Sequence, residues 1–372
     1  MTKSYRILAI NPGSTSTKVA VFDGDTKVLS ENVSHDAARL KEFACVSDEL
    51  PYRYEMISAL LVEKGIDASS FDAVVGRGGS LLSCEGGTYL VDDLLYEHAR
   101  TSANGVAHPA QLGPQLARKF AQISGVDAYV VNPPDTDEYQ DVARVTGIDG
   151  VYRTSHLHAL NLKETAIRHA ASLGRRYDEC NFVVCHLGGG VSVSAHRAGR
   201  MVDGYDIVGG EGPMAPTRCG SVPAAALSAW LAEGHDLSDL RGQMHKAGGF
   251  VSHCGTSDAR ELTAKAEAGD EHAKLVWNAF IYQVIKGVGA MAAVLHGHVD
   301  GILLGGGIVH SSELVDAITD ACGFIAPVTA YPGEFEMEAM AAGVVRVLTG
   351  QEELKTYTGK PAWSGFAWDK EN

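Results

Sequence analysis

Apolar and polar positions along the chain form short strand-like runs and longer helix-like repeats. The first residues show the strand pattern, because the apolar stretches ILAI and VAVF flank the small polar turn of NPGSTSTK. Apolar runs of about four to eight residues that end at glycine predict strands, and apolar positions three or four apart predict amphipathic helices. Strand and helix patterns alternate along this chain, which indicates an α/β fold.

The pattern predicts eleven strands and nine helices in two groups. The strands are expected at Tyr5–Ile10, Val19–Phe22, Lys27–Val33, Ala73–Val75, Tyr89–Val91, Ala128–Val131, Phe182–His186, Val191–His196, Met201–Asp203, Gly301–Leu304 and Val328–Tyr331. The helices are expected at Tyr52–Lys64, Asp92–Arg100, Ala110–Ser124, Ala159–Leu173, Pro223–Glu233, Ala259–Glu267, Glu271–His296, Ser312–Cys322 and Phe335–Leu348. The pair Pro133 and Pro134 interrupts the pattern. We therefore place the change of domain at Gly147–Arg153, which gives domains of residues 1–150 and 151–334.

A strand–turn–strand–turn–strand pattern occurs twice, once near the start of each predicted domain. When ILAINPGSTSTKVAVFDGDTKV is shifted by 175 residues onto FVVCHLGGGVSVSAHRAGRMV, Gly13 falls on Gly188 and Gly24 falls on Gly199. Two such hairpins, each opening one half of the chain, are what a duplicated α/β fold would show.

Composition and charge limit the class of protein. The 372 residues carry a net charge of −15 without a block rich in lysine and arginine, so nucleic acid and anionic membranes are not expected as partners. No run of 18 apolar residues occurs, and the apolar stretch before Asn11 is too short for a signal peptide. The seven cysteines have no CxxC spacing, which favours reduced thiols and a cytoplasmic location.

Three glycine clusters follow apolar strands, at NPGSTSTK, HLGGGVSV and GILLGGGIVHSSEL. Glycine lets the backbone approach a phosphate closely, and backbone N–H groups then bind its oxygens. Ser14, Thr15, Ser16 and Thr17 add hydroxyl donors in the first cluster, and Lys18 adds a positive charge. The sequence contains neither a P-loop motif nor an HExxH motif, and we treat the G-x-G-x-x-A of residues 210–215 as a chance match.

A dozen motifs in order along nearly the whole chain resemble those of the butyrate kinases, close relatives of the acetate kinases. They include NPGSTSTK, GRGG, EGGTY, HPAQLG, HLHALNLK, HLGGGVSV, GEGPMAPTR, TSDAREL, GGGIVHS and YPGEFEMEAM. The resemblance implies the duplicated actin-like ATPase fold, with two ribonuclease-H-like domains, an active-site cleft between them, and a last helix at about 335–350 that returns to the first domain. It also implies the reversible, ATP-dependent phosphorylation of a short-chain fatty acid, with Mg²⁺, in a homodimer or higher homo-oligomer.

The resemblance implies catalytic roles for two arginines and one histidine. Arg77 in VVGRGGS and Arg218 in APTRCGS match the arginines that this family places beside the carboxylate and the transferring phosphate. A guanidinium suits that role because its paired N–H groups can bind an anion with two hydrogen bonds. His158 in SHLHALN matches the histidine that donates to the phosphoryl group, whereas His156 stands where an apolar residue is usual. His108 in AHPAQLG aligns with a histidine on the substrate side.

Two carboxylates match the acidic residues that the family places near Mg²⁺. Asp137 in NPPDTDEY matches an aspartate close to the metal and the phosphates, with Asp135 as the competing choice. Glu336 in PGEFEME matches a glutamate on the metal side, with Glu334 as the competing choice. One or two carboxylates suffice, because Mg²⁺ keeps several waters and binds the nucleotide phosphates.

The residues implied in nucleotide and phosphate binding come from all three glycine clusters and one helix start. They are Asn11, Ser14, Ser16, Lys18, His186, Gly188, Gly189, Gly190, Asp258, Arg260, Gly305, Gly306 and Gly307. Acetate kinases usually have an asparagine in the second cluster where this chain has Gly189, which leaves more of the binding to backbone N–H groups. Arg260 suits either a contact with the nucleotide or a helix cap.

Two alternatives stay open. The chain suits another acid kinase, acting on acetate, propionate or a branched acid, because one methylene changes specificity by only about 1–3 kcal/mol. A regulatory ATP-binding protein on the same fold, without phosphoryl transfer, is the alternative of a different class. Arg77, Arg218 and His158 argue against it, because nucleotide binding alone does not require them.

Overall fold

The computed structural model describes residues 4–370, which form two compact units. Unit 1 contains the described residues up to Asp137 together with those from Phe335 onward, and unit 2 is Glu138–Glu334. The first change of unit thus lies before the expected division at residues 150 and 151. The reason is that Glu138 is built into unit 2, where its buried carboxylate accepts hydrogen bonds from Nζ of Lys163 and from the backbone N–H of Met201.

Unit 1 contains a seven-stranded sheet with the order β12-β5-β6-β4-β1-β2-β3. Strands β1, β2 and β3 form antiparallel hairpins, while β4 and β6 continue the sheet in parallel on the other side of β1. The bounds are β1 Arg6–Pro12, β2 Ser16–Asp23, β3 Thr26–Ser34, β4 Ala73–Gly76, β5 Thr88–Leu90, β6 Ala128–Val131 and β12 Leu354–Lys355.

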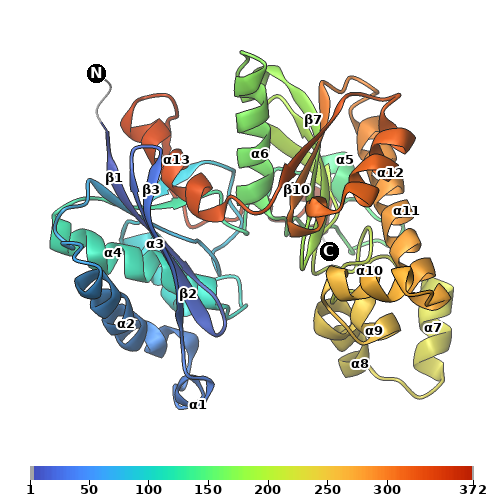
Figure 1. The fold of residues 1–372 in the computed structure, drawn as a ribbon, viewed down its shortest axis with the longest axis horizontal. Coiled ribbons are helices and arrows are strands. Elements are labelled where there is room, and N and C mark those ends of the chain that lie inside the picture. The colour runs from blue at the N-terminus through green and yellow to red at the C-terminus, as the bar shows by residue number, and fades with distance from the viewer. Residues whose placement is uncertain (1–3, 371–372) are drawn as a thin grey trace. The chain divides into compact units, whose positions relative to one another are not determined.

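Helices cover both faces of this sheet (Figure 1). Leu8 and Ile10 of β1 pack into one core with helices α2 and α4, and α13 lies against the opposite face of β1, β4 and β6. Both faces of the sheet can be covered because successive side chains along a strand point to opposite faces. The bounds are α1 Ala37–Leu40, α2 Leu50–Glu63, α3 Asp93–Thr101, α4 Leu112–Ser124 and α13 Glu336–Leu348, with the short helices η1 Val46–Glu49, η2 Pro109–Gln111 and η6 Ala367–Lys370.

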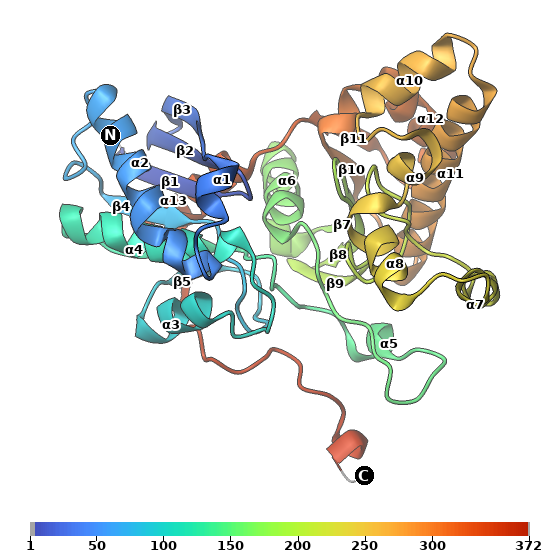
Figure 2. The same ribbon diagram turned by 90° about the horizontal axis from the view of Figure 1, so that it is seen from below.

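Unit 2 contains a five-stranded sheet with the order β11-β10-β7-β8-β9. Helix α6 covers the face of β7 that carries Phe182 and Val184, and helices α11 and α12 cover the face that carries Val183 and Cys185 (Figure 2). The strands are β7 Asn181–Leu187, β8 Val191–Arg197, β9 Arg200–Gly204, β10 Gly301–Gly306 and β11 Val328–Pro332. The helices are α5 Asp141–Arg144, α6 Ala159–Ser172, α7 Ala224–Ala232, α8 Leu237–Gly242, α9 Phe250–Cys254, α10 Ala259–Glu267, α11 Glu271–Val294 and α12 Ser312–Cys322, with η3 Tyr177–Glu179, the π-helix η4 Gln243–Ala247 and η5 Gly307–His310.

The two sheets repeat one topology, as the internal repeat in the sequence predicts. In each unit three antiparallel strands, β1–β3 or β7–β9, are followed by two parallel strands on the far side of the first, β4 and β6 or β10 and β11. Gly24 and Gly199, which the repeat aligns, both lie in the turn after the second strand with positive φ, at 61° and 80°. Each of the eleven predicted strands and nine predicted helices has a counterpart with bounds close to those expected.

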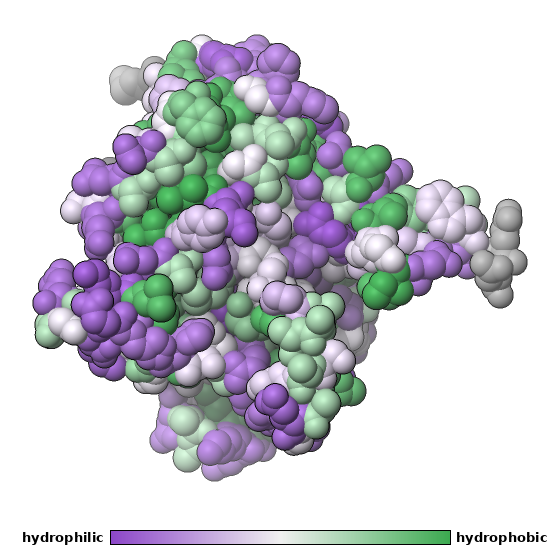
Figure 3. Space-filling view, turned by 90° about the vertical axis from the view of Figure 1, so that its right-hand side faces the viewer, coloured by the Kyte–Doolittle hydropathy of each residue, from purple (hydrophilic) through white to green (hydrophobic). Residues whose placement is uncertain are grey.

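The long helix α11 is central to unit 2. By length and composition it would suffice to cross a membrane, but half of its apolar window is buried, and Trp277, Phe280 and Val284 belong to the core of the unit. Its outer side exposes Leu275 and Tyr282, and Figure 3 shows hydrophobic side chains scattered among hydrophilic ones on the side where α11 and α12 lie. All seven cysteines are free thiols.

Candidate active site

The first glycine cluster forms the turn between β1 and β2. The backbone N–H of Gly13 bonds to the carbonyl of Ser16 at 2.7 Å, which closes the turn and leaves Ser14 exposed. Asn11 is the second-last residue of β1, beside the turn, and Lys18 is exposed on β2. Thr17 is an exception among the hydroxyl residues, because it is fully buried and its Oγ1 bonds to His35 at 2.8 Å.

Arg77 directly follows β4, in a segment packed too tightly for larger residues. A Cβ atom at Gly76 would lie 2.1 Å from the carbonyl oxygen of Gly113, and one at Gly113 would lie 2.0 Å from that of Arg77. The start of α4 therefore rests directly on the end of β4. The backbone N–H of Arg77 also bonds to the carbonyl of Ile10, which fixes the arginine beside the end of β1.

The carboxylate of Glu336 joins the two strand ends. One oxygen accepts a hydrogen bond from Nη1 of Arg77 at 3.0 Å, and the other accepts one from Nδ2 of Asn11 at 2.7 Å. Glu336 is the first residue of α13, so the last helix of the chain brings an anion to Arg77. Glu334, the competing choice, belongs to unit 2 instead and lies near Gly188.

His108 and Asp137 also belong to unit 1. His108 caps the short helix η2, where its Nδ1 accepts a bond from the N–H of Ala110. Loss of solvent lowers the pKa of His108, and the charge of Arg77 lowers it further, so this imidazole is neutral at pH 7. Asp137 is buried and held through its backbone N–H to the carbonyl of Cys84, whereas Asp135 accepts a side-chain bond from Asn104.

In unit 2 the second glycine cluster forms the turn between β7 and β8, and two histidines lie beside it. The rings of His158 and His186 stack with 4.1 Å between their centroids. Nδ1 of His158 is 2.8 Å from Oγ of the buried Ser192, which fixes the orientation of the imidazole. His156 has a different partner, Oδ2 of Asp206 at 3.2 Å.

The side chains of Arg218 and His158 both lie against Gly190. A Cβ atom at Gly190 would lie 2.2 Å from Nη1 of Arg218 and 3.0 Å from Nε2 of His158, so only glycine leaves room for both side chains. Nε and Nη1 of Arg218 are buried and have no hydrogen-bond partner among residues 4–370. Burial lowers the pKa of the Arg218 guanidinium, against a smaller opposing effect of Asp206. Buried N–H groups of a cation that lack partners are costly, and an anionic ligand would relieve that cost.

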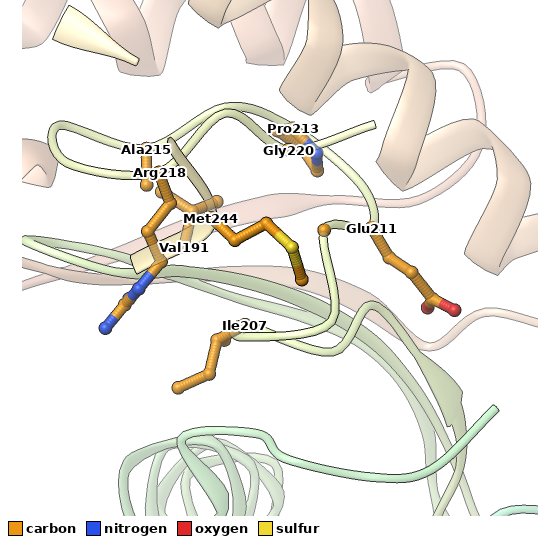
Figure 4. Close-up of a pocket in the computed structure, with 9 residues that line it drawn as sticks. Val191, Ile207, Glu211, Pro213, Ala215, Arg218, Gly220 and Met244 are labelled. Atoms are coloured by element: carbon orange, nitrogen blue, oxygen red, sulfur yellow. The ribbon is translucent and has the colours of Figure 1, made fainter. Parts of the chain in front are cut away.

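The loop that carries Arg218 is held from two sides. Gln283 of α11 accepts a bond from the N–H of Met214 at 2.7 Å, and the carbonyl of Gln243 accepts one from Cys219. Figure 4 shows the pocket beside Arg218, with Ile207 and Met244 among its lining residues. Its volume is about 10 Å³, roughly the space of one water molecule. In this state the pocket is too small for the alkyl chain of a fatty acid.

The remaining nucleotide candidates lie at two helix starts of unit 2. Gly305 and Gly306 end β10, and Gly307 begins η5. Asp258 caps α10 and pairs with the exposed Arg260 through a 2.6 Å contact. The cap of α10 is thus Asp258 and not Arg260, and the hydrogen bonds from Arg260 lower the pKa of Asp258 to about 2.

The predicted residues therefore gather as two sets, one in each unit. Asn11, Arg77 and Glu336 are joined in unit 1, and His158, His186, Gly190 and Arg218 are joined in unit 2. Sequence reasoning missed Ser192, the partner of His158. Its only signal is the alternation of serine and valine in the stretch GVSVSAH, which Ser194 shares.

The chain is similar to known proteins along nearly its whole length. Residues 140–325 match the model of the acetokinase family. The chain is 41% identical over 354 residues to "Probable butyrate kinase 2" of Caldanaerobacter subterraneus, covering 95% of this chain and 99% of that protein. It is also 41% identical to "Butyrate kinase 2" of Clostridium acetobutylicum, with the same coverage.

Solved structures show the same fold. The crystal structure of Porphyromonas gingivalis acetate kinase superposes with a TM-score of 0.77 at 19% identity, covering 93% of this chain and all of that one. Acetate kinase from Entamoeba histolytica gives a TM-score of 0.73 at 15% identity, with 92% of this chain covered. The duplicated actin-like ATPase fold is therefore confirmed. Together with the identity to two curated relatives along nearly the whole sequence, the family match shows that this chain belongs to the acetokinase family.

Proposed function

We propose that the chain is a butyrate kinase, which transfers the γ-phosphoryl group of ATP to the carboxylate of butanoate and gives butanoyl phosphate and ADP, reversibly. Its 41% identity to butyrate kinases along almost the whole chain supports this substrate class. The observation that carries the proposal is Arg218, a half-buried arginine whose Nε and Nη1 are buried without a partner among residues 4–370, beside His158. Such a pair of donors suits the charged oxygens of a transferring phosphoryl group.

The reaction requires the protein to position the two substrates and to stabilise charge, rather than to form a covalent bond itself. A carboxylate oxygen of the acid attacks the γ-phosphorus, the bond to the bridging oxygen of ADP breaks, and ADP leaves with the electron pair. The carboxylate is already ionised at pH 7, so no general base is required. We assign Arg77, Arg218 and His158 to the equatorial oxygens and to the acyl carboxylate, and His108 to the acid.

The carboxylates of Asp137 and Glu336 suit a magnesium ion that binds together with the nucleotide. Residues 4–370 contain no cluster of three or more His, Cys, Asp or Glu side chains that would hold a metal without help. Asp137 and Glu336 supply the one or two carboxylates that Mg²⁺ takes beside water and phosphate oxygens. When bound, Mg²⁺ would neutralise phosphate charge. Asn11 and Arg77 hold the Glu336 carboxylate in a fixed orientation.

We place the two glycine turns and the 305–307 cluster on the nucleotide, with Ser14, Ser16, Lys18, His186, Gly188, Gly189 and Gly190 near its phosphates. Asp258 and Arg260 are the weakest members of this set, since they already pair with each other. The cytoplasm is the proposed location, because ATP is available there. A homodimer stays a prediction from the family, which sedimentation of the purified chain would test.

A hydroxamate assay tests the proposal directly. Acyl phosphates react with hydroxylamine, so incubation with ATP, Mg²⁺ and a series of acids from two to six carbons reports which acid is phosphorylated. We expect kcat/KM to be highest for butanoate and activity to vanish when the metal is chelated. A maximum at acetate or propionate would replace butanoate as the substrate. Nucleotide binding without hydroxamate from any acid would mean a regulatory ATP-binding protein.

A further inference from the structure

Arg53 is a buried cation behind the first glycine turn. It lies on α2 in line with Ile57 and Leu61, the buried stripe of that helix, and its own side chain is 0% exposed. A charged side chain in such a position is costly unless it is fully paired. Glu49, one helical turn earlier, accepts bonds from Nε at 2.7 Å and from Nη2 at 2.6 Å. The ion pair with Glu49 leaves Nη1 and part of Nη2 available for other hydrogen bonds.

The rest of the guanidinium binds the turn. Nη1 donates to the carbonyl oxygens of Gly13 at 2.8 Å and of Ser16 at 3.3 Å, and to Oγ1 of Thr17 at 3.1 Å. Nη2 is 3.4 Å from the carbonyl oxygen of Ser14. One side chain thus gathers three carbonyl groups of the segment that joins β1 to β2.

This arrangement decides where the N–H groups of the turn point. In a planar trans peptide the C=O and the next N–H point in opposite directions. With the carbonyls of Gly13 and Ser14 turned toward Arg53, the N–H groups of Ser14 and Thr15 are turned away from it, toward the exposed side. No acceptor within residues 4–370 takes either N–H group. Adjacent free N–H groups in an exposed turn form a concave anion site.

We propose that Arg53 is the positioning residue of the first phosphate-binding turn, which it holds with its backbone N–H groups facing the nucleotide phosphates. The inference rests on the proposed function, since it takes the ligand of the turn to be ATP. Arg53 itself does not reach the ligand, because it is buried behind the turn. Its effect is on the affinity for nucleotide rather than on the acid or on the chemical step.

The test compares Arg53→Met with Glu49→Gln. Arg53→Met removes the contacts to the turn, whereas Glu49→Gln keeps them and weakens only the ion pair, so it is the matched control. In Arg53→Met we expect KM for ATP to rise roughly tenfold or more, the effect of losing one good hydrogen bond to phosphate. KM for butanoate and kcat should stay within about twofold. Glu49→Gln should lower the melting temperature and leave KM for ATP unchanged.

Arg53→Lys keeps the experiment decisive if Arg53→Met does not fold. A lysine presents a single point of charge and cannot span three carbonyl groups as the guanidinium fork does, so KM for ATP should still rise several-fold in the folded variant. A wild-type KM for ATP in whichever variant is folded overturns the proposal, as does an equal change for both substrates.

Direct titration with ADP separates this inference from the proposed function. Each variant is titrated calorimetrically in the absence of any acid, and the dissociation constant should follow the same order as KM for ATP. If the wild type binds ADP but phosphorylates no acid, the proposed function fails while the affinities still decide the role of Arg53. Equal ADP affinity in the wild type and in the folded Arg53 variant overturns the inference alone.

Discussion

Arg77 and Arg218 differ in how the fold holds their charge, and this difference leads to opposite expectations for stability. Arg77 is paired with Glu336, whereas Nε and Nη1 of Arg218 are buried without a partner among the described residues. Residues kept for function at a cost in stability often show this pattern.

Replacing either arginine should abolish most of the activity. Loss of a charge donor to the transition state costs roughly 10²–10³ in kcat, so Arg77→Ala and Arg218→Ala should both fall by about that factor. In thermal melts, Arg218→Ala should be as stable as the wild type or more stable, while Arg77→Ala should be less stable because Glu336 loses its partner. Arg176→Ala, at an exposed pair with Asp178, is the control. Wild-type kcat in either variant would remove that arginine from the mechanism.

Ser192 acts one contact away from the reaction, through the imidazole of His158. Without the hydroxyl, the ring loses the bond that orients it, and Ser192→Ala should lower kcat by roughly tenfold, the value of one such hydrogen bond. Ser194→Ala is the matched control, because this serine is equally buried on the same strand but contacts His196 and the carbonyl of Val184. If both variants lose kcat equally, strand β8 is merely disturbed and the orienting role is wrong.

At the residue scale, the sequence predicts residues that belong to recognisable motifs. It misses the residues that hold those motif residues in place. Arg77 and His158 stand in glycine- or histidine-rich stretches, whose composition signals chemistry. Ser192 and Arg53 stand in strand and helix segments that also carry other polar residues, such as Ser194 and Glu55, so nothing along the chain distinguishes them. What they contact depends on the tertiary structure, which a pattern along the chain does not contain.

At the scale of elements, long periodic segments could be predicted and very short ones could not. The predicted helix Glu271–His296 is α11, but α1, α5, α8, α9 and β12 were not predicted. These elements have two to six residues, fewer than two helical turns, so no repeat of apolar positions can develop in them. The change of unit after Asp137 lies closer to the pair Pro133 and Pro134 than to the expected Gly147–Arg153, because packing of Glu138 into unit 2 sets it.

In the third glycine cluster, Gly306 and Gly307 have different surroundings, and the sequence alone does not distinguish them. Gly306 has φ of 99°, and a Cβ there would lie 2.3 Å from the carbonyl oxygen of Leu187, whereas Gly307 has nothing within 4 Å. Gly306→Ala should therefore destabilise the protein by about 2 kcal/mol or more. Gly307→Ala should stay within about 0.5 kcal/mol of the wild type.

Urea unfolding measures both stabilities, and KM for ATP shows whether Gly307 lies against the nucleotide. A higher KM in a fully stable Gly307→Ala variant would support the nucleotide assignment of this residue, and an unchanged KM would contradict it. A Gly306→Ala variant as stable as the wild type would contradict the packing argument.

At the scale of the whole molecule, each unit contains a buried neutral histidine that makes it sensitive to acid. Burial, helped by the charge of Arg53, lowers the pKa of His35 to about 4. Burial also lowers the pKa of His196 to about 3, with the charge of Lys163 adding to the shift. In the unfolded chain both titrate near 6.5.

Stability should therefore be greatest above pH 6.5 and fall as the pH drops toward 4, because the unfolded state binds protons that the folded state rejects. Each histidine contributes up to about 1.4 kcal/mol per pH unit in that window. Urea unfolding between pH 7.5 and 4.5 measures the slope, and His196→Gln should reduce it by about one proton. His253→Gln, at an exposed histidine, should leave the slope unchanged. Equal slopes in the wild type and His196→Gln would mean that His196 is already protonated in the folded state.

The return of α13 to unit 1 sets the order in which the enzyme can be completed during synthesis. Unit 2 is one continuous segment, so all of it has been translated when Glu334 is added. Unit 1 still lacks α13, β12 and η6 at that moment, although most of its residues were made first. The bond from Asn11 to Glu336 closes a loop of 325 residues and can form only near the end of translation. A ribosome that stops before Glu336 thus releases a chain whose second unit is whole and whose first unit has no anion to hold Arg77.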